Sequence, residues 1–339
     1  MSRTARRVIL ATLVWATVAL ATLGPPSGFG LDDRAVASPV VDDERLSGEF
    51  VAKLGRLADA AAKGGTLGSE AAAEQLAAAE GRTVRIPPAS VPCVIGPARS
   101  VYDAVMPAVV VVGSVFKCGK CNDWHMGGLA SGWLLSADGL VVTNHHVFGR
   151  DPNHRFGVMT ADGQVYGVEA VLAADAPGDA VIVRIDTRGR PLPCLALGKT
   201  PECGDDVTVI SHPAGRFFCL TEGVVSRFHR QRQPRPEPAD DPSAGDQPVN
   251  PGVEPRPAAA NLASARAAVW MSVTADYAIG SSGGPVLNSA GEVVGMVSRT
   301  FSTRAGDRRR LTGTPGDQMV FKDCVSLDTL RRLVADDPS

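Results

Sequence analysis

The chain has 339 residues, of which 44% are hydrophobic and 21% are charged. This composition is typical of a folded globular protein and excludes wholesale disorder. The formal net charge of −2 leaves no overall basic field, which argues against nucleic acid as a partner. The 36 glycines and 25 prolines favour a turn-rich β protein over a helical bundle.

The N-terminus has the pattern of a secretory signal. Three arginines within residues 3–7 precede an uncharged apolar run over residues 8–23. We predict a signal peptide over residues 1–21, and therefore export to the periplasm or the extracellular space. The alternative is a membrane anchor formed by residues 8–23, although this run is shorter than the roughly 20 residues that span a bilayer.

Residues 22–97 are predicted to form a helical or loosely ordered N-terminal extension. Four large apolar side chains recur there at helical spacing, namely Leu46, Phe50, Leu54 and Leu57. An Ala-rich stretch over residues 70–80 is a second candidate helix. We interpret both as a spacer or as surface-packed helices rather than as a partner-binding arm, because no residue type in them points to chemistry.

From residue 98 onward, short apolar segments separated by turn signals predict roughly a dozen strands with few helices between them. Such a pattern is typical of antiparallel sandwiches or barrels. Residues 231–260 hold 8 of the prolines and are predicted to be a disordered surface loop. The remaining length suits two barrels, and apolar spacing over residues 326–335 predicts a closing helix.

Three segments of this β region carry candidate catalytic groups. In Gly280-Ser281-Ser282-Gly283-Gly284-Pro285 the glycines would allow a tight turn, expose the Ser282 hydroxyl and direct amides toward an oxyanion. His146 ends an apolar strand and would supply the near-neutral base that a serine hydroxyl needs. The alternatives are an ordinary Gly/Ser turn and a surface histidine pair.

Asp179 opens the apolar segment 180–185, where a carboxylate is costly unless it has a partner. Partnership with a histidine Nδ1–H would hold the imidazole in the productive tautomer. Asp175 competes for this role, but it lies in the loop before the apolar run. All six histidines precede Ser282, which excludes the order of an α/β-hydrolase and matches the chymotrypsin order of histidine, aspartate and serine.

Residues 98–336 resemble a trypsin-like serine protease of the HtrA/Deg type. The resemblance rests on residues 108–112, 131–139, 143–147, 179–185, 222–226, 280–285 and 326–333. It implies an all-β double β-barrel of the chymotrypsin/trypsin type, with the N-terminal helical extension, a short C-terminal helix and the 231–260 loop inserted in the second barrel. It also implies that His146 is the base, Asp179 its orienting acid and Ser282 the nucleophile, with the amides of Gly280 and Ser282 as the oxyanion hole.

The same resemblance implies hydrolysis of peptide bonds in unfolded or damaged polypeptides, without a cofactor. We expect no PDZ domain after the terminal helix, because few residues remain. Two residues are candidates for the substrate pocket, Asp276 and Ser298. Asp276 lies six residues before Ser282, where trypsin-type enzymes place an acid that selects Arg or Lys. Asp276 could instead cap a loop.

The seven cysteines of an exported protein predict disulfides with at least one thiol left over. Cys118 and Cys121, with His125 nearby, permit a small-loop disulfide, a zinc site or a redox pair. We favour the disulfide here, because zinc in a structural site needs four ligands and only three are visible. Cys194 and Cys203 could bridge neighbouring strands.

Two other functions stay open at this point. The chain could be a catalytically silent trypsin-like fold that acts as a binding module, although it keeps all three triad residue types. It could also hydrolyse non-peptide esters. An oligomer is possible, and association with a membrane is expected only if the apolar segment 8–23 is retained.

Overall fold

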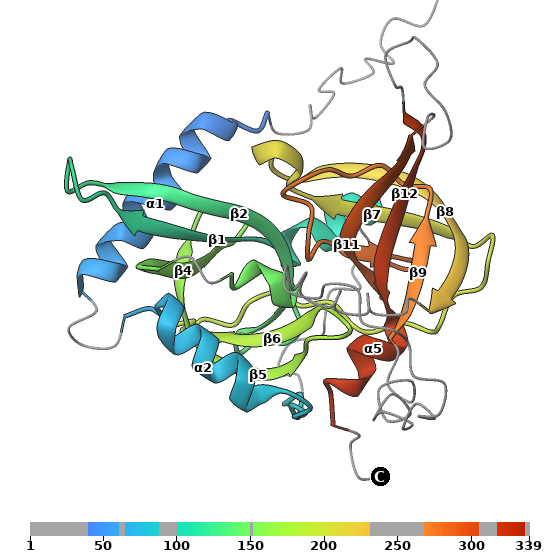
Figure 1. Cartoon of the computed structure of the whole chain (residues 1–339), viewed down its shortest axis with the longest axis horizontal. Helices are drawn as coiled ribbons and strands as arrows, with labels where there is room; N and C mark the ends of the chain where they lie inside the picture. Colours follow the sequence, from blue (N-terminus) through green and yellow to red (C-terminus); the bar gives the residue numbers. More distant parts are fainter. Residues whose placement is uncertain are drawn as a thin grey trace, which may run out of the picture. The chain divides into compact units, whose positions relative to one another are not determined.

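The computed structural model describes residues 40–60, 65–87, 100–149, 152–230, 268–304 and 317–335. The predicted signal peptide, the apolar segment 8–23 and the Pro-rich segment 231–260 lie outside these residues. All the described helices and strands belong to one compact unit that begins at Asp42. Strands outnumber helices in this unit, and Figure 1 shows them as two side-by-side groups.

The first group is a closed antiparallel barrel in the strand order β1-β2-β3-β6-β5-β4. Its strands are β1 (Val109–Lys117), β2 (Trp124–Leu134), β3 (Leu140–Thr143), β4 (His154–Met159), β5 (Val165–Asp175) and β6 (Ala180–Ile185). Successive side chains of β1 enter different apolar clusters, with Val110 inside the barrel and Val109 and Val111 outside it. This burial of both faces explains the unbroken run of valines.

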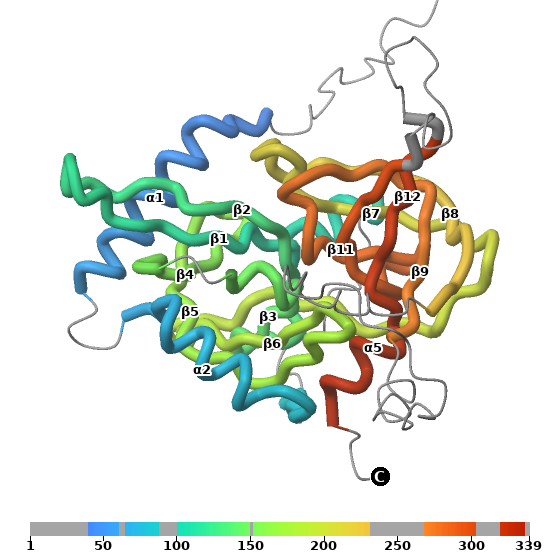
Figure 2. The backbone as a smooth tube through the Cα atoms, in the orientation of Figure 1, coloured from blue at the N-terminus to red at the C-terminus, as the bar shows by residue number. Residues whose placement is uncertain are grey.

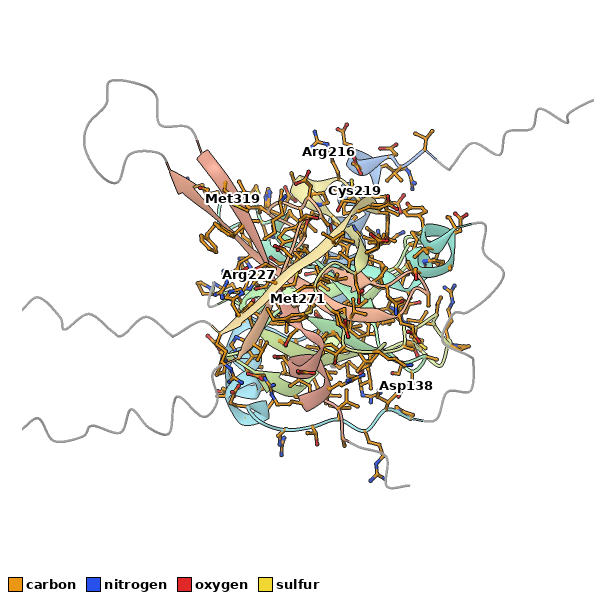
Figure 3. The ribbon with its side chains drawn as sticks, turned by 90° about the vertical axis from the view of Figure 1, so that its right-hand side faces the viewer. Asp138, Arg216, Cys219, Arg227, Met271 and Met319 are labelled. Atoms are coloured by element: carbon orange, nitrogen blue, oxygen red, sulfur yellow. The ribbon has the colours of Figure 1, made fainter. Side chains whose placement is uncertain are left out.

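The second group is a closed antiparallel barrel in the order β10-β11-β12-β9-β8-β7. Its strands are β7 (Asp206–Ser211), β8 (Cys219–Arg230), β9 (Val269–Val273), β10 (Pro285–Leu287), β11 (Val293–Arg304) and β12 (Asp317–Ser326). Met271 lies in its core, as Figure 3 shows, together with Val209 and Cys324. The two six-stranded barrels confirm the predicted double-barrel fold.

Two N-terminal helices complete the first barrel. In α1 (Asp43–Asp59) the apolar side chains at helical spacing pack against Val111 and Met159 of the barrel wall. In α2 (Ser69–Ala79) the buried face joins the barrel's interior cluster. Both helices belong to the compact unit that begins at Asp42, and they pack against the first barrel.

Shorter helices lie between and after the strands. They are α3 (Val101–Val105), the 3-10 turns η2 (Met106–Ala108), η3 (His145–Val147) and η4 (Pro213–Gly215), and α5 (Leu327–Arg332). None of the helices within the described ranges is long and apolar enough to cross a membrane.

A single apolar cluster joins the two barrels. It combines Trp133 and Ile182 of the first barrel with Leu287 and Met296 of the second, and Leu330 of α5 packs into it. Figure 2 shows the tube passing from the green first barrel to the yellow-to-red second barrel, with α5 below β9 and β12. This shared core packs β3 and β6 of the first barrel against β10 and β11 of the second.

Candidate active site

The imidazole of His146 and the carboxylate of Asp179 form a close pair on the first barrel. His146 lies in η3, directly after β3, and its Nδ1 is 2.9 Å from Asp179 Oδ2. The His146 backbone N–H also donates to Asp179 Oδ1 at 3.1 Å. This double contact orients the ring, leaving Nε2 as the nitrogen that does not face the carboxylate.

Asp179 reaches this position through an unusual backbone conformation. Its φ is +53°, in the left-handed region, and the Asn144 side chain donates to its carbonyl oxygen at 2.8 Å. The competing Asp175 is occupied elsewhere, since it accepts from the Gly178 amide and pairs with Arg332 at 2.9 Å. The preference for Asp179 over Asp175 therefore agrees with the observed contacts.

Ser282 lies in a tight glycine turn at the start of the second barrel's β10. Gly280 and Gly283 have φ values of +96° and +87°, and a Cβ on Gly283 would come within 2.0 Å of the Ser131 carbonyl oxygen. Side chains are therefore excluded at Gly280, two residues before the serine, and at Gly283, directly after it. The Ser282 hydroxyl donates to the carbonyl oxygen of Ser298 at 3.1 Å.

Ser131, on β2 of the first barrel, ties that turn to the first barrel. Its backbone N–H donates to the Ser282 carbonyl at 2.7 Å, and its hydroxyl donates to the Gly280 carbonyl at 2.9 Å. The same hydroxyl accepts from the His212 backbone N–H at 3.0 Å. One buried side chain thus joins three segments that are distant in sequence, and the sequence analysis did not single it out.

His146 and Ser282 line the same cavity, which has a volume of about 320 Å³. Its wall also includes Val112, Leu129 and Gly280. Ile279, at the rim, is 91% exposed. The cavity therefore brings together an imidazole, a hydroxyl and a glycine turn from the two barrels.

The peptide between Ile279 and Gly280 has a defined orientation. The Ile279 carbonyl accepts from the Ala214 amide at 2.6 Å. Because the carbonyl and the amide of a trans peptide point in opposite directions, the Gly280 N–H is directed away from Ala214. Within the described part of the chain, neither the Gly280 amide nor the Ser282 amide donates to a protein acceptor.

The two candidate pocket residues have other contacts. The Ser298 hydroxyl donates to Asp179 Oδ2 at 2.5 Å, so Ser298 supports the carboxylate instead of pointing to a substrate. The Asp276 side chain is 84% exposed and pairs with Lys322. Asp276 is not among the residues that line the cavity of His146 and Ser282.

His212 is a buried histidine next to this site. Its Nδ1 accepts from the Phe218 amide at 3.0 Å, and its ring packs edge-on against that phenylalanine. Burial lowers the pKa of His212 to about 4, so the ring is neutral near neutral pH. Sequence reasoning gave no role to this residue, because burial of a histidine depends on packing that the local sequence does not reveal.

The cysteines differ from two expectations. Cys118 and Cys121 are free thiols, not the predicted small-loop disulfide. Cys194 is disulfide-bonded, but Cys203 is a free, exposed thiol, so the suggested pairing of these two is wrong. The thiols of Cys118 and Cys121 lie close to His125, as the alternative of a zinc site requires.

Two closed antiparallel barrels, with a histidine–aspartate pair on one and a glycine-flanked serine on the other, define the chymotrypsin class of fold. Residues 130–296 match the trypsin-like peptidase domain family. The chain thus carries a trypsin-like peptidase domain, and it is related to the proteases of the HtrA/Deg type.

Three curated relatives illustrate this similarity. A probable periplasmic serine endoprotease DegP-like of Pseudomonas fluorescens is 32% identical over 52% of this chain and 30% of its own length. Protease Do-like 5, chloroplastic, of Arabidopsis thaliana is 28% identical over 53% and 50%. Serine protease HTRA2, mitochondrial, of Bos taurus is 31% identical over 49% and 30%. The chain spans 30% to 50% of the length of these relatives.

Proposed function

We propose that this protein is a serine endopeptidase that cleaves peptide bonds through an acyl-enzyme. The observation that carries the proposal is the cavity shared by Ser282 and His146, in which the His146 imidazole is held from behind by Asp179 at 2.9 Å. A neutral imidazole fixed through Nδ1–H presents Nε2 as a proton acceptor. Membership of the trypsin-like peptidase fold supports the same chemistry.

In the first stage, Ser282 Oγ attacks the scissile carbonyl carbon while His146 Nε2 accepts the hydroxyl proton. The developing oxyanion is stabilised by the Gly280 and Ser282 amides, which have no other acceptor among the described residues. The imidazolium then gives its proton to the departing amine. In the second stage, water attacks the ester through the same base and releases the new carboxylate.

The Ser282 hydroxyl must turn before it can react, because it donates to the Ser298 carbonyl. A rotation about χ1 exchanges that acceptor for His146 Nε2, and such contacts tighten when substrate binds. Asp179 stays in place during this rotation, because Ser298 and Asn144 hold it from two sides. We therefore assign Asp179 to orientation of the imidazole rather than to proton transfer.

Unfolded or damaged proteins exported with the enzyme are the substrates we propose. The reactive groups lie in a cavity rather than on a protruding surface, so a scissile bond reaches them only on an extended, accessible chain. A periplasmic or extracellular site of action is supported by the apolar N-terminal segment and by the periplasmic relative. Specificity for Arg or Lys through Asp276 is not favoured, because that side chain pairs with Lys322.

The test is a comparison of Ser282→Ala with Ser289→Ala, a change of an exposed serine nearby on the same chain. A fluorophosphonate probe should label the unmodified protein and Ser289→Ala but not Ser282→Ala. Hydrolysis of a reduced, unfolded protein should fall by several orders of magnitude in Ser282→Ala alone. Absence of both labelling and hydrolysis in the unmodified protein would instead favour a catalytically silent binding module.

A further inference from the structure

The tip of the β1–β2 hairpin brings two thiols and an imidazole together. Cys118 and Cys121 lie in the turn after β1, and His125 is the second residue of β2. The two sulfurs and a ring nitrogen of His125 all lie within 4.8 Å of one another. Cys121 Sγ is 3.0 Å from His125 Nε2. Thiolate and imidazole are the ligands that zinc prefers in proteins.

Backbone hydrogen bonds hold the turn that carries Cys118 and Cys121. Asn122 has a φ of +60° and its amide donates to the Cys118 carbonyl at 2.8 Å, which curls the chain around the first thiol. The Lys120 backbone amide donates to the Cys118 sulfur at 3.5 Å. The Asp123 amide donates to the Cys121 sulfur. Amide bonds of this kind support a metal-bound thiolate from behind.

Neighbouring aromatic rings hold the His125 imidazole with one ring nitrogen toward the thiols. His125 is paired with Phe116 across the two strands, and the two rings stack with centroids 5.7 Å apart. Phe116 in turn stacks on the His154 ring at 5.4 Å. The stack fixes the plane of the His125 ring, while Nε2 faces the thiols.

Helix α1 anchors the base of this tip. The Trp124 indole donates to Asp59 Oδ2 at 3.1 Å, and Lys117 forms an ion pair with the same carboxylate at 3.2 Å. The three donor residues themselves remain at least partly open to solvent. A metal ion can therefore reach the tip without unfolding the barrel.

We propose that Cys118, Cys121 and His125 form a zinc site whose fourth position is open to water. Ligands of a tetrahedral zinc ion are about 3.5–3.8 Å apart, so the donors need shift by only about an ångström. Among the described residues no fourth protein ligand joins this group. Two thiolates balance the charge of the ion, and binding would release the thiol protons still present.

A disulfide between the two cysteines would not account for the imidazole. Such a bond would use both sulfurs and would leave His125 Nε2 facing a group that needs no basic partner. It would also make no use of the backbone amides that donate to each sulfur. The zinc site uses all of these features, and it requires nothing from the cavity of His146 and Ser282.

The experiment uses the full chain, reduced and freed of metal with a chelator that is then removed. Addition of Co²⁺ should produce thiolate-to-cobalt charge-transfer bands and the visible bands of a tetrahedral ion, and Zn²⁺ should abolish both. Equilibrium dialysis should give one zinc per chain. The variants Cys118→Ser and His125→Ala should bind Zn²⁺ at least roughly 100-fold more weakly.

Cys203→Ser is the matched control, because Cys203 is also a free, exposed thiol but has no histidine partner in the described part of the chain. It should bind zinc as tightly as the unmodified protein. Thermal unfolding of every variant without metal shows whether folding is retained. The proposal is overturned if the reduced, folded protein takes up no zinc, or if Cys118→Ser and His125→Ala bind it as well as Cys203→Ser.

Discussion

The two barrels have the same strand number and closure, yet they are buried very differently. Seven of the nine residues of β1 in the first barrel are buried, whereas one of the twelve residues of β8 in the second is. The helices α1 and α2 pack against the first barrel and account for much of this difference. The outer face of β1 is therefore covered by a helix, whereas most of β8 is at least partly open to solvent.

This difference matches what each barrel contributes to the site. The first holds the histidine–aspartate pair, whose geometry depends on two side chains and a strained backbone. The second supplies a hydroxyl and a set of backbone amides on one turn. That turn does not depend on its own barrel alone, because Ser131 binds it to the first.

The largest expected effect is that of Asp179→Asn, which tests whether the first barrel supplies the acid that orients His146. An amide can accept from Nδ1–H, but it can also impose the wrong imidazole tautomer, so we expect kcat to fall by about 10⁴. Peptidase assays on an unfolded protein substrate measure the loss. Asp186→Asn, which changes an exposed acid at the far end of β6, should keep full activity. Equal activity of both variants would show that the pair is not functional.

The contribution of the outer layer is tested by Leu54→Ala in α1. Leu54 is fully buried against the barrel wall, and its removal should lower the free energy of unfolding by about 2–5 kcal/mol. Urea denaturation measures this change. Arg56→Ala alters an exposed position of the same helix and should have little effect. A loss below about 1 kcal/mol for Leu54→Ala would mean that α1 is only loosely attached.

The double barrel could be predicted from the sequence because its signals are local. Valine runs and turn residues occupy short segments, and His146, Asp179 and Ser282 each lie in a short motif of their own. The helical spacing of Leu46, Phe50 and Leu54 also predicted a helix where α1 is found. The pattern could not show what this helix packs against, since its partners Val111 and Met159 are distant in sequence.

The finer contacts of the site could not be predicted for the same reason. The Ser298 hydroxyl reaches a carboxylate 119 residues away, and the hydroxyl of Ser131 meets a carbonyl 149 residues away. The sequence did not single out Ser131, and it suggested a substrate-pocket role for Ser298 instead of the contact with Asp179. The small-loop disulfide was expected because the spacing of Cys118 and Cys121 permits several kinds of site, and only the structure shows that both thiols are free and lie close to His125.

The buried histidine of the second barrel makes stability depend on pH. The pKa of His212 is about 4 in the folded protein and about 6.5 when exposed, so only the unfolded chain binds a proton between these values. Stability should therefore fall as the pH drops through this range, by about 3 kcal/mol in total. In His212→Asn, whose amide oxygen can still accept from Phe218, this part of the pH dependence should be lost. The free energy of unfolding is measured against pH for both proteins. If it changes equally with pH in the unmodified protein and in His212→Asn between about pH 7 and about pH 4.5, the assignment is refuted.

The smallest expected effect concerns Ser131, whose hydroxyl links the two barrels. Its variant distinguishes a residue that positions the turn of Ser282 from one that only stabilises the fold. Ser131→Ala removes a hydroxyl that donates to Gly280 and accepts from His212, which should cost about 1–3 kcal/mol of stability. Because that hydroxyl also holds the turn of Ser282 in place, we expect kcat to fall by about 10- to 100-fold with little change in KM.

Ser272→Ala is the control, because it removes another buried serine hydroxyl, one bound to Asp323 in the second barrel. It should lower stability to a similar or greater extent while leaving kcat unchanged at temperatures where the protein is folded. Equal kcat values for the two variants would show that the barrels hold the turn in place without Ser131.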